Sequence, residues 1–209
     1  MQENSRAKLV QLLVASALTA ESAAKGNNSL LVDSEMVEIQ RMLTNGALKI
    51  TDASIYSTKD ASNSRLVRMF ETSDVEAKGI TNMTAGKLQR NQVVLVDRIR
   101  ITAATSAAAI NGSAAVLGGL SYGTIRDHGG LIAGTITIRQ SNKNVSYQVS
   151  LRNFDTTGRS DIATGLYFLE APLLLRSQQL IEANIELGRA LPDRQAIRLE
   201  LLGSQTAAF

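Results

Sequence analysis

The chain has 209 residues, of which one is histidine and none is cysteine. The missing cysteines exclude thiol nucleophiles, disulfides and cysteine-ligated zinc or iron–sulfur sites. One histidine also falls short of the two or three imidazoles that catalytic zinc and non-haem iron sites normally use. The composition therefore predicts a protein with no catalytic residues, no metal and no cofactor.

Charge and aromatic content weigh against two kinds of binding site. The 22 basic and 19 acidic residues leave a net charge of +3, well short of the large positive field of nucleic-acid-binding proteins. Aromatic residues make up 4% of the chain and tryptophan is absent, so stacking platforms for bases or sugars are scarce. We expect no strong sequence-specific nucleic-acid binding and no small-molecule substrate.

The N-terminal segment has the periodicity of a helix. Apolar residues recur every three or four positions between Arg6 and Ala24, and Gly26 follows as a stop. Such an alanine- and leucine-rich stripe is weak by itself and needs another surface to cover it, either its own sandwich or a neighbouring subunit. The candidate assembly interface is this stripe: Leu9, Leu12, Leu13, Ala17 and Ala20.

Two other interpretations of this segment are weaker. Arg6 and Lys8 precede an apolar run, as in a signal peptide, but Glu3 lies in the charged region and Gln11 interrupts the run. A helix that lies on a membrane surface would carry aromatic residues and more basic ones. Since no later segment approaches ~18 apolar residues, we expect neither a signal peptide nor a transmembrane segment.

A second helix is predicted from Asp33 to Thr44, with Asp33 or Ser34 as the N-cap and Asn45-Gly46 as the stop. Beyond it the chain consists of short alternating segments bounded by Gly, Asn, Asp and Ser. We therefore divide the chain into a helical arm, residues 1–45, and a β-sandwich domain, residues 46–209.

Period-two alternation predicts the strands. From Leu180 to Leu187 apolar and polar residues alternate, the pattern of an antiparallel sheet that covers a core on one side. We expect a mainly β fold, an eight-strand antiparallel sandwich that is jelly-roll-like. We expect segments 132–139 and 145–152 to form a hairpin through Ser141–Asn144. The segments with strand character are 48–56, 65–70, 93–101, a glycine-rich stretch between 116 and 125, 132–139, 145–152, 166–175, 180–187 and 197–201.

The alternation breaks within the segment from Val93 to Ile101. Without a break, Asp97 would share a face with apolar residues, and burying it is costly unless it has a partner. We therefore expect a register shift near Asp97-Arg98, a bend of the kind that lets a strand serve two sheets at a corner. Segment 48–56 also changes face along its length.

A serine-hydrolase motif has to be considered at Gly119–Gly123, which matches G-x-S-x-G around Ser121, with Asp127 and His128 downstream. A nucleophile elbow needs a strand, a sharp turn and then a helix, and no helix is expected before Gly129-Gly130. We interpret the stretch as a flexible strand and loop. As a metal ligand His128 would lack partners, so a loop histidine or a subunit contact is the simpler interpretation.

A helical arm followed by about eight antiparallel strands with long end loops resembles the single jelly-roll coat and vertex proteins of icosahedral viruses and phages. The resemblance is one of overall plan and covers roughly Gly46 to Phe209. It implies that the sandwich is a building block of a shell, that the arm reaches under or between neighbours, and that the protein is located in the virion.

The charge of the arm departs from that plan. Residues 1–25 carry three basic and two acidic residues, a net charge of 3 − 2 = +1, whereas a genome-packaging arm is far more basic. This charge suits a shell lined by membrane or by other protein. The expected partners are copies of the chain and other shell proteins, with a membrane surface or the genome as further candidate contacts of the arm.

Three functions remain in order of preference. The first is a structural protein that self-assembles into a viral or phage shell. The second is a carbohydrate-binding or adhesion sandwich, which a cluster of aromatic residues at one loop end would favour. The third is a serine hydrolase that uses Ser121.

Overall fold

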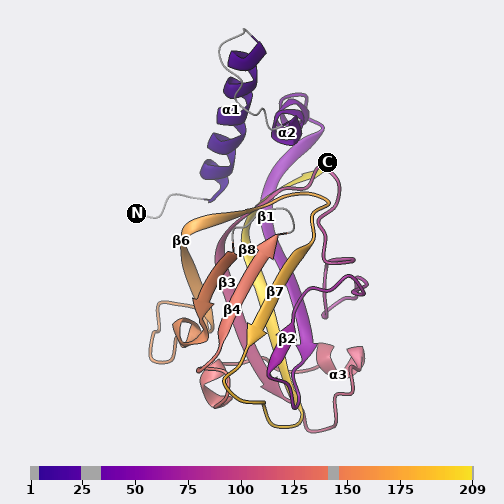
Figure 1. Ribbon diagram of the computed structural model, residues 1–209, viewed down its shortest axis with the longest axis vertical. Helices are drawn as coiled ribbons and strands as arrows, with labels where there is room; N and C mark the ends of the chain where they lie inside the picture. Colours follow the sequence, from indigo (N-terminus) through magenta and orange to yellow (C-terminus); the bar gives the residue numbers. More distant parts are fainter. Residues whose placement is uncertain (1–4, 25–33, 141–145, 209) are drawn as a thin grey trace.

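The computed structural model describes residues 5–24, 34–140 and 146–208 (Figure 1). Both predicted helices are present, as α1 (Ser5–Ala24) and α2 (Ser34–Thr44). The predicted stop after α2 is confirmed, because Gly46 has a φ of 73°, which favours glycine. The alternative N-cap Asp33 lies outside the described residues.

Eight strands follow and form two four-stranded antiparallel sheets, which confirms the predicted mainly β sandwich. One sheet has the order β1-β8-β3-β6 and the other β2-β7-β4-β5. The strands are β1 (Leu48–Asp60), β2 (Leu66–Arg68), β3 (Val94–Thr105), β4 (Thr135–Gln140), β5 (Ser146–Ser150), β6 (Leu166–Leu175), β7 (Ile181–Glu186) and β8 (Gln195–Ala208).

The strand pairs reveal how the chain is wound. The first strand pairs with the last, the second with the seventh, the third with the sixth and the fourth with the fifth. This is a single long antiparallel ladder rolled up on itself, which is the topology of a jelly roll. The predicted turn Ser141–Asn144 lies outside the described residues, but the strands on either side of it do pair.

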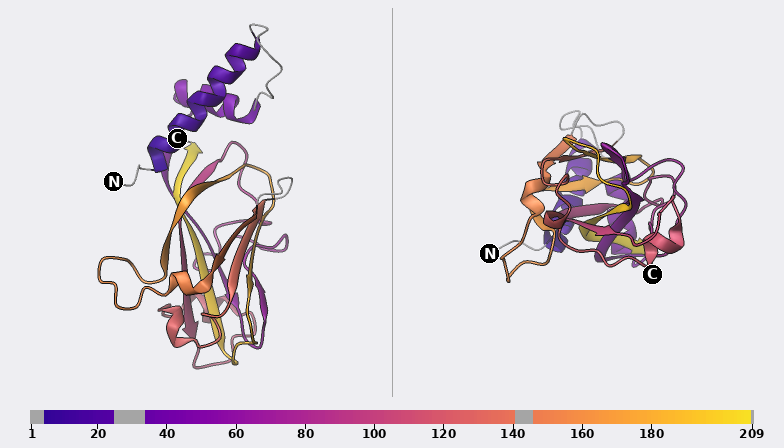
Figure 2. Two further views of the ribbon diagram at one scale, coloured as in Figure 1. Left: turned by 60° about the vertical axis from the view of Figure 1, so that its left-hand side comes forward. Right: turned by 90° about the horizontal axis from the view of Figure 1, so that it is seen from below.

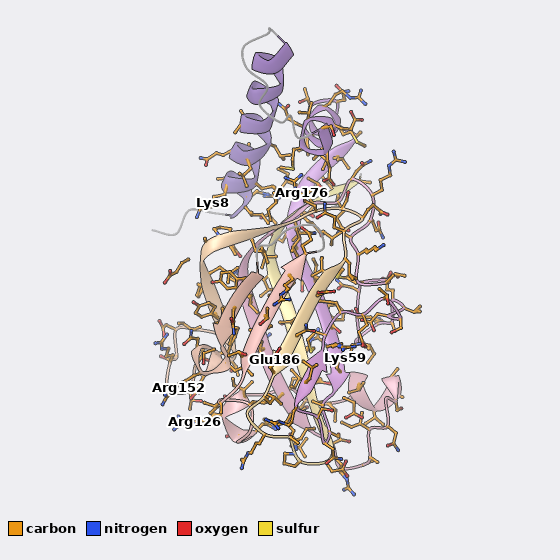
Figure 3. The ribbon with its side chains drawn as sticks, viewed as in Figure 1. Lys8, Lys59, Arg126, Arg152, Arg176 and Glu186 are labelled. Atoms are coloured by element: carbon orange, nitrogen blue, oxygen red, sulfur yellow. The ribbon has the colours of Figure 1, made fainter. Side chains whose placement is uncertain are left out.

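The core fills the space between the two sheets. Along β7 the side chains of Ile181, Ala183 and Ile185 are buried, whereas Glu182 and Glu186 are exposed. Figure 3 labels Glu186 on this strand. The predicted alternation of this segment is therefore confirmed, because one face of the sheet meets the core and the other meets solvent.

The predicted register shift in β3 is also confirmed. A bulge lies between Val96 and Arg98, and the neighbouring strands β6 and β8 both follow it. Asp97 is half-buried and accepts a hydrogen bond from Nε of Arg98 (2.9 Å). The expectation that this bend lets the strand serve two sheets is wrong, because β3 keeps the same two neighbours on either side of the bulge.

The bulge instead reverses which face of β3 meets the core. Before it, Val94 and Val96 point into the sandwich, and after it Ile99 and Ile101 do. Leu95 points to the opposite face, where it packs against the two helices. One strand thus contributes to two separate hydrophobic clusters.

The change of face in β1 has a different cause. This strand pairs with β8 in continuous register from Leu48 to Asp60. Leu48 and Ile50 contact the helices, whereas Ala53 and Ile55 belong to the sandwich core. The strand itself is regular, and its two faces are covered at different points along its length. The helices cover one face near Leu48, and the sandwich core covers the other face near Ile55. Figure 2 shows the helices projecting beyond one end of the sandwich.

The glycine-rich stretch between 116 and 125 is not a strand, so that prediction is wrong. Its contact with a sheet is an isolated bridge between Gly123 and Ala103. The sequence Ala-Ala-Val-Leu favours a helical turn over a strand, and Leu117 is buried against Ile110. The short helices are α3 (Ala114–Gly118), η1 (Ile125–Asp127) and η2 (Leu151–Phe154).

Two neighbouring residues of β7 test the face assignment. We expect Ile185→Asp to lower the free energy of unfolding by roughly 3 kcal/mol or more, because it buries an unpaired carboxylate. Glu186→Ala, on the exposed face, should cost less than ~0.5 kcal/mol. Urea denaturation measures both, and equal midpoints for the two variants would contradict the assignment.

A glycine beside the bulge gives a second test. A Cβ atom on Gly203 would lie 1.9 Å from the carbonyl oxygen of Leu95, a backbone atom that cannot move away alone. Gly203→Ala should therefore cost roughly 1–3 kcal/mol of unfolding free energy. Gly123→Ala is the control, because no atom lies within 4 Å of its added Cβ. Similar unfolding midpoints for the two variants would show that the close approach to β3 is not a real constraint.

Candidate assembly surface

The face of α1 that meets the sandwich is the most strongly packed part of the arm. Leu9 and Leu13 are buried within the chain. They pack with residues of α2 and with the outer face of β1 and β3, where the sheet extends beyond the sandwich core. The members of this arm cluster are Leu9, Leu13, Met36, Ile39, Leu48, Val93 and Leu95.

Polar contacts fix the arm to the sandwich as well. The Oε1 atom of Glu35, in the first turn of α2, accepts a hydrogen bond from the backbone N–H of Ser177 (3.2 Å) and another from its hydroxyl. Arg176 lies 3.7 Å from the same carboxylate. In the first turn of α1, Arg6 donates a hydrogen bond to the carbonyl oxygen of Ile50 in β1 (2.6 Å). The helices are thus held in a defined position on the jelly roll.

The predicted interface residues therefore divide into three groups. Leu9 and Leu13 are covered within the same chain, so they are not available to a neighbour. Leu12 is 42% exposed. The side chains of Ala17 and Ala20 lie outside the described part of the structure.

Two exposed residues of α1 were absent from the predicted interface. Val10 is 44% exposed and Val14 is 43% exposed, on a different side of the helix from the buried leucines. The signal that identifies them is the absence of charge, since every residue from 9 to 20 is uncharged. Aliphatic residues on a helix surface are normally covered, yet the contacts within this chain bury Leu9 and Leu13 and leave Val10 and Val14 exposed.

A groove adjoins the exposed face of Leu12. It runs between α1 and the edge strand β6, and Pro172 lies in its wall. Proline is tolerated at this position because β6 has a free edge and residues 169–172 lie outside its pairing with β3. The groove is lined by Lys8, Gln11, Leu12, Ala15, Leu95 and Pro172.

The opposite end of the molecule is a set of loops tied together by arginines. Arg65 donates to the carbonyl oxygen of Gly188 (3.1 Å), and Arg189 donates to that of Gly129 (3.1 Å). Arg194 donates to a third loop carbonyl, that of Ala107 (2.9 Å). Figure 3 labels Arg126 and Arg152 at this end. The contacts hold neighbouring loops in a fixed arrangement.

The G-x-S-x-G residues do not form a catalytic triad. Ser121 is exposed, and among the described residues no hydrogen bond joins it to His128. The Nδ1 atom of His128 donates to Oε1 of Gln195 (2.6 Å), a neutral amide in place of the carboxylate that orients a triad histidine. In the described part of the chain His128 thus contacts Gln195, and Ser121 lies on the surface.

Tyr122 gives this motif a structural role. Its hydroxyl donates to the carbonyl oxygen of Leu117 (2.9 Å), at the end of α3. Burial of the ring raises the pKa of Tyr122 to about 12, so the phenol stays protonated and keeps donating. The motif fastens a helical turn to the loop that follows it.

Three of the described aromatic residues lie together, namely Tyr147, Phe154 and Tyr167. Phe70 and Phe154 are buried, and the Phe154 ring lies 5.4 Å from that of Tyr167. Tyr56 lies under the guanidinium of Arg198, 4.5 Å from its ring centroid, on a different part of the molecule. The group of Tyr147, Phe154 and Tyr167 is the feature that bears on the carbohydrate-binding alternative, and Phe154 within it is buried.

None of the helices in the described part of the chain is both long and apolar enough to cross a membrane.

No protein-family model and no curated protein matches the chain. Among solved structures, it shows a weak likeness to a chain of the acidic stable capsid structure of Helicobacter pylori bacteriophage KHP30. The TM-score is 0.27 and the identity 5%, over 78% of this chain and 99% of that chain.

Proposed function

We propose that this protein is a structural subunit that self-assembles into a viral or phage shell. The observation that carries the proposal is α1, which has no charged residue from 9 to 20 and is covered within its own chain on the face of Leu9 and Leu13. Because its other faces expose Val10, Leu12 and Val14 to water, a neighbouring subunit would stabilise the helix by covering them.

The way the arm is held supports this role. A helix on a flexible tether would lose much conformational freedom on binding, whereas this one is already fixed by the arm cluster and by Glu35. The jelly roll beneath it is the kind of sandwich from which viral shells are built. Copies of the chain and other shell proteins are the partners that fit, and the virion is the corresponding location.

The size of the surface sets the strength of each contact. Stable protein complexes bury about 800 Å² on each partner, and three half-exposed aliphatic side chains supply much less. A single contact through α1 is therefore weak, and it gains strength when many copies bind at once. Assembly should consequently depend steeply on protein concentration.

Replacing the exposed valines tests the proposal. We expect the purified wild-type chain to form large assemblies in multi-angle light scattering and negative-stain microscopy. The double variant Val10→Glu/Val14→Glu should remain monomeric, because it places charges in the contact. Its unfolding midpoint should change little, because both side chains are partly exposed.

The matched control is Val75→Glu, since Val75 is 73% exposed in the connection between β2 and β3, away from the arm. This variant should assemble as the wild type does. A wild-type chain that stays monomeric across a wide concentration range would overturn the proposed function.

A further inference from the structure

A lysine lies on the core-facing side of β1. Along this strand Lys59 shares a face with Ile55 and Ser57, both of which are buried. The Lys59 side chain is 21% exposed, and Figure 3 labels it on the part of β1 that lies away from the arm. Lysine is rarely enclosed in this way unless its ammonium is paired. The groups that meet this ammonium therefore indicate what the residue does.

The ammonium of Lys59 meets two carboxylates from the turn that follows β2. Its Nζ atom donates to Oε2 of Glu71 (3.1 Å) and to Oδ1 of Asp74. Because β1 and β2 are edge strands of different sheets, these contacts connect the two sheets of the sandwich at its edge. One amine thus lies between two acids, whereas an ion pair requires only one.

Asp74 is fixed by three hydrogen bonds besides its contact with the lysine. Its backbone N–H donates to the carbonyl oxygen of Glu71 (3.1 Å), and its own carbonyl oxygen accepts from the N–H of Ala85 (2.8 Å). Its Oδ2 atom accepts from the N–H of Glu71 (2.9 Å), so that Oδ1 remains for the amine. The Asp74 side chain is 10% exposed, against 38% for Glu71. Asp74 is therefore the fixed partner of the amine, and Glu71 is the freer acid.

We propose that Lys59 and Asp74 join in an isopeptide bond within the chain, and that Glu71 carries the proton. Bond formation needs an amine held against a carboxyl carbon, and fixed geometry of this kind replaces an external catalyst. Withdrawal from water favours the neutral amine and acid, which are the forms that react. The site lies apart from α1 and goes beyond the proposed function. Its product would close the loop between residues 59 and 74 and so restrict the unfolded chain.

The bond forms by loss of one water, without an oxidant, a reductant or a second reactant. The ammonium of Lys59 first gives one proton to Oδ1 of Asp74, which leaves a neutral amine beside a carboxylic acid. The nitrogen lone pair then forms a bond to Cγ of Asp74. Glu71 takes a second proton from the nitrogen and passes it to the Asp74 hydroxyl, which leaves as water when its bond to Cγ breaks. The third proton stays on the amide nitrogen, and Glu71 returns to its ionised form.

Mass spectrometry of the purified chain tests the proposal. The intact wild-type protein should be lighter than its sequence by one water molecule. Trypsin should then release residues 50–65 joined to residues 69–78, because an acylated lysine is no longer a cleavage site. Fragment ions must place the bond between Lys59 and Asp74, since succinimide formation at an aspartate also removes water.

Variants separate the roles of the three groups. Lys59→Arg keeps the positive charge but offers no amine, so it should retain the full sequence mass. Glu71→Gln keeps the shape of the side chain and removes the proton carrier, so most of this variant should still be unjoined when the wild type is fully joined. Its matched control is Glu76→Gln, an exposed acid in the same connection, which should join as the wild type does.

The outcomes keep this inference separate from the proposed function. A wild-type chain with its full sequence mass would overturn the inference and leave an ordinary ion pair. A bond from Lys59 to Glu71 would overturn it as well, because the roles of the two acids would be exchanged. A joined chain that stays monomeric would overturn the proposed function alone, and particles built from unjoined chains would overturn this inference alone.

Discussion

The bulge at Asp97 is the constraint on which the rest of the molecule depends. By shifting the register of β3, it lets Val94 and Val96 before it and Ile99 and Ile101 after it all face the sandwich core. The central strand β8 accommodates the shift with Gly203, where any side chain would meet the backbone of β3. Because side chains alternate along a strand, Leu95 lies on the opposite face, where it packs against the helices. The sheet therefore supports two hydrophobic clusters, one on each of its faces.

The second cluster explains why an otherwise weak helix has a defined place. A helix of this length and composition gains most of its stability from packing, and here Leu9 and Leu13 are buried against the extended end of the sheet. The same geometry leaves Val10 and Val14 on an exposed side. The arm thus has a defined place on the sheet and an exposed aliphatic surface beside it.

The two ends of the sandwich differ in a way that fits this role. At one end, residues 9–20 of α1 carry no charge, and Val10, Leu12 and Val14 among them are exposed. At the other, arginines donate to loop carbonyls such as those of Gly188 and Gly129, so the loops are tied to one another. The residues that first suggested enzyme chemistry belong to the same structural framework, since His128 binds Gln195 and Tyr122 fastens the end of α3.

The sequence by itself determined the elements whose signal is local. Alternation along 180–187 identified β7, the misplaced Asp97 identified the bulge, and the helical period identified both helices of the arm. The stretch between 116 and 125 misled the same reasoning, because the short apolar run before Gly118 is too short to distinguish a helical turn from a strand. Only the tertiary structure decided that Leu9 and Leu13 are covered within the chain while Val10 and Val14 are not. The physical reason is that apolar residues lie on more than one side of this helix, so the helical period does not select the buried face, and the surface on which the helix packs does.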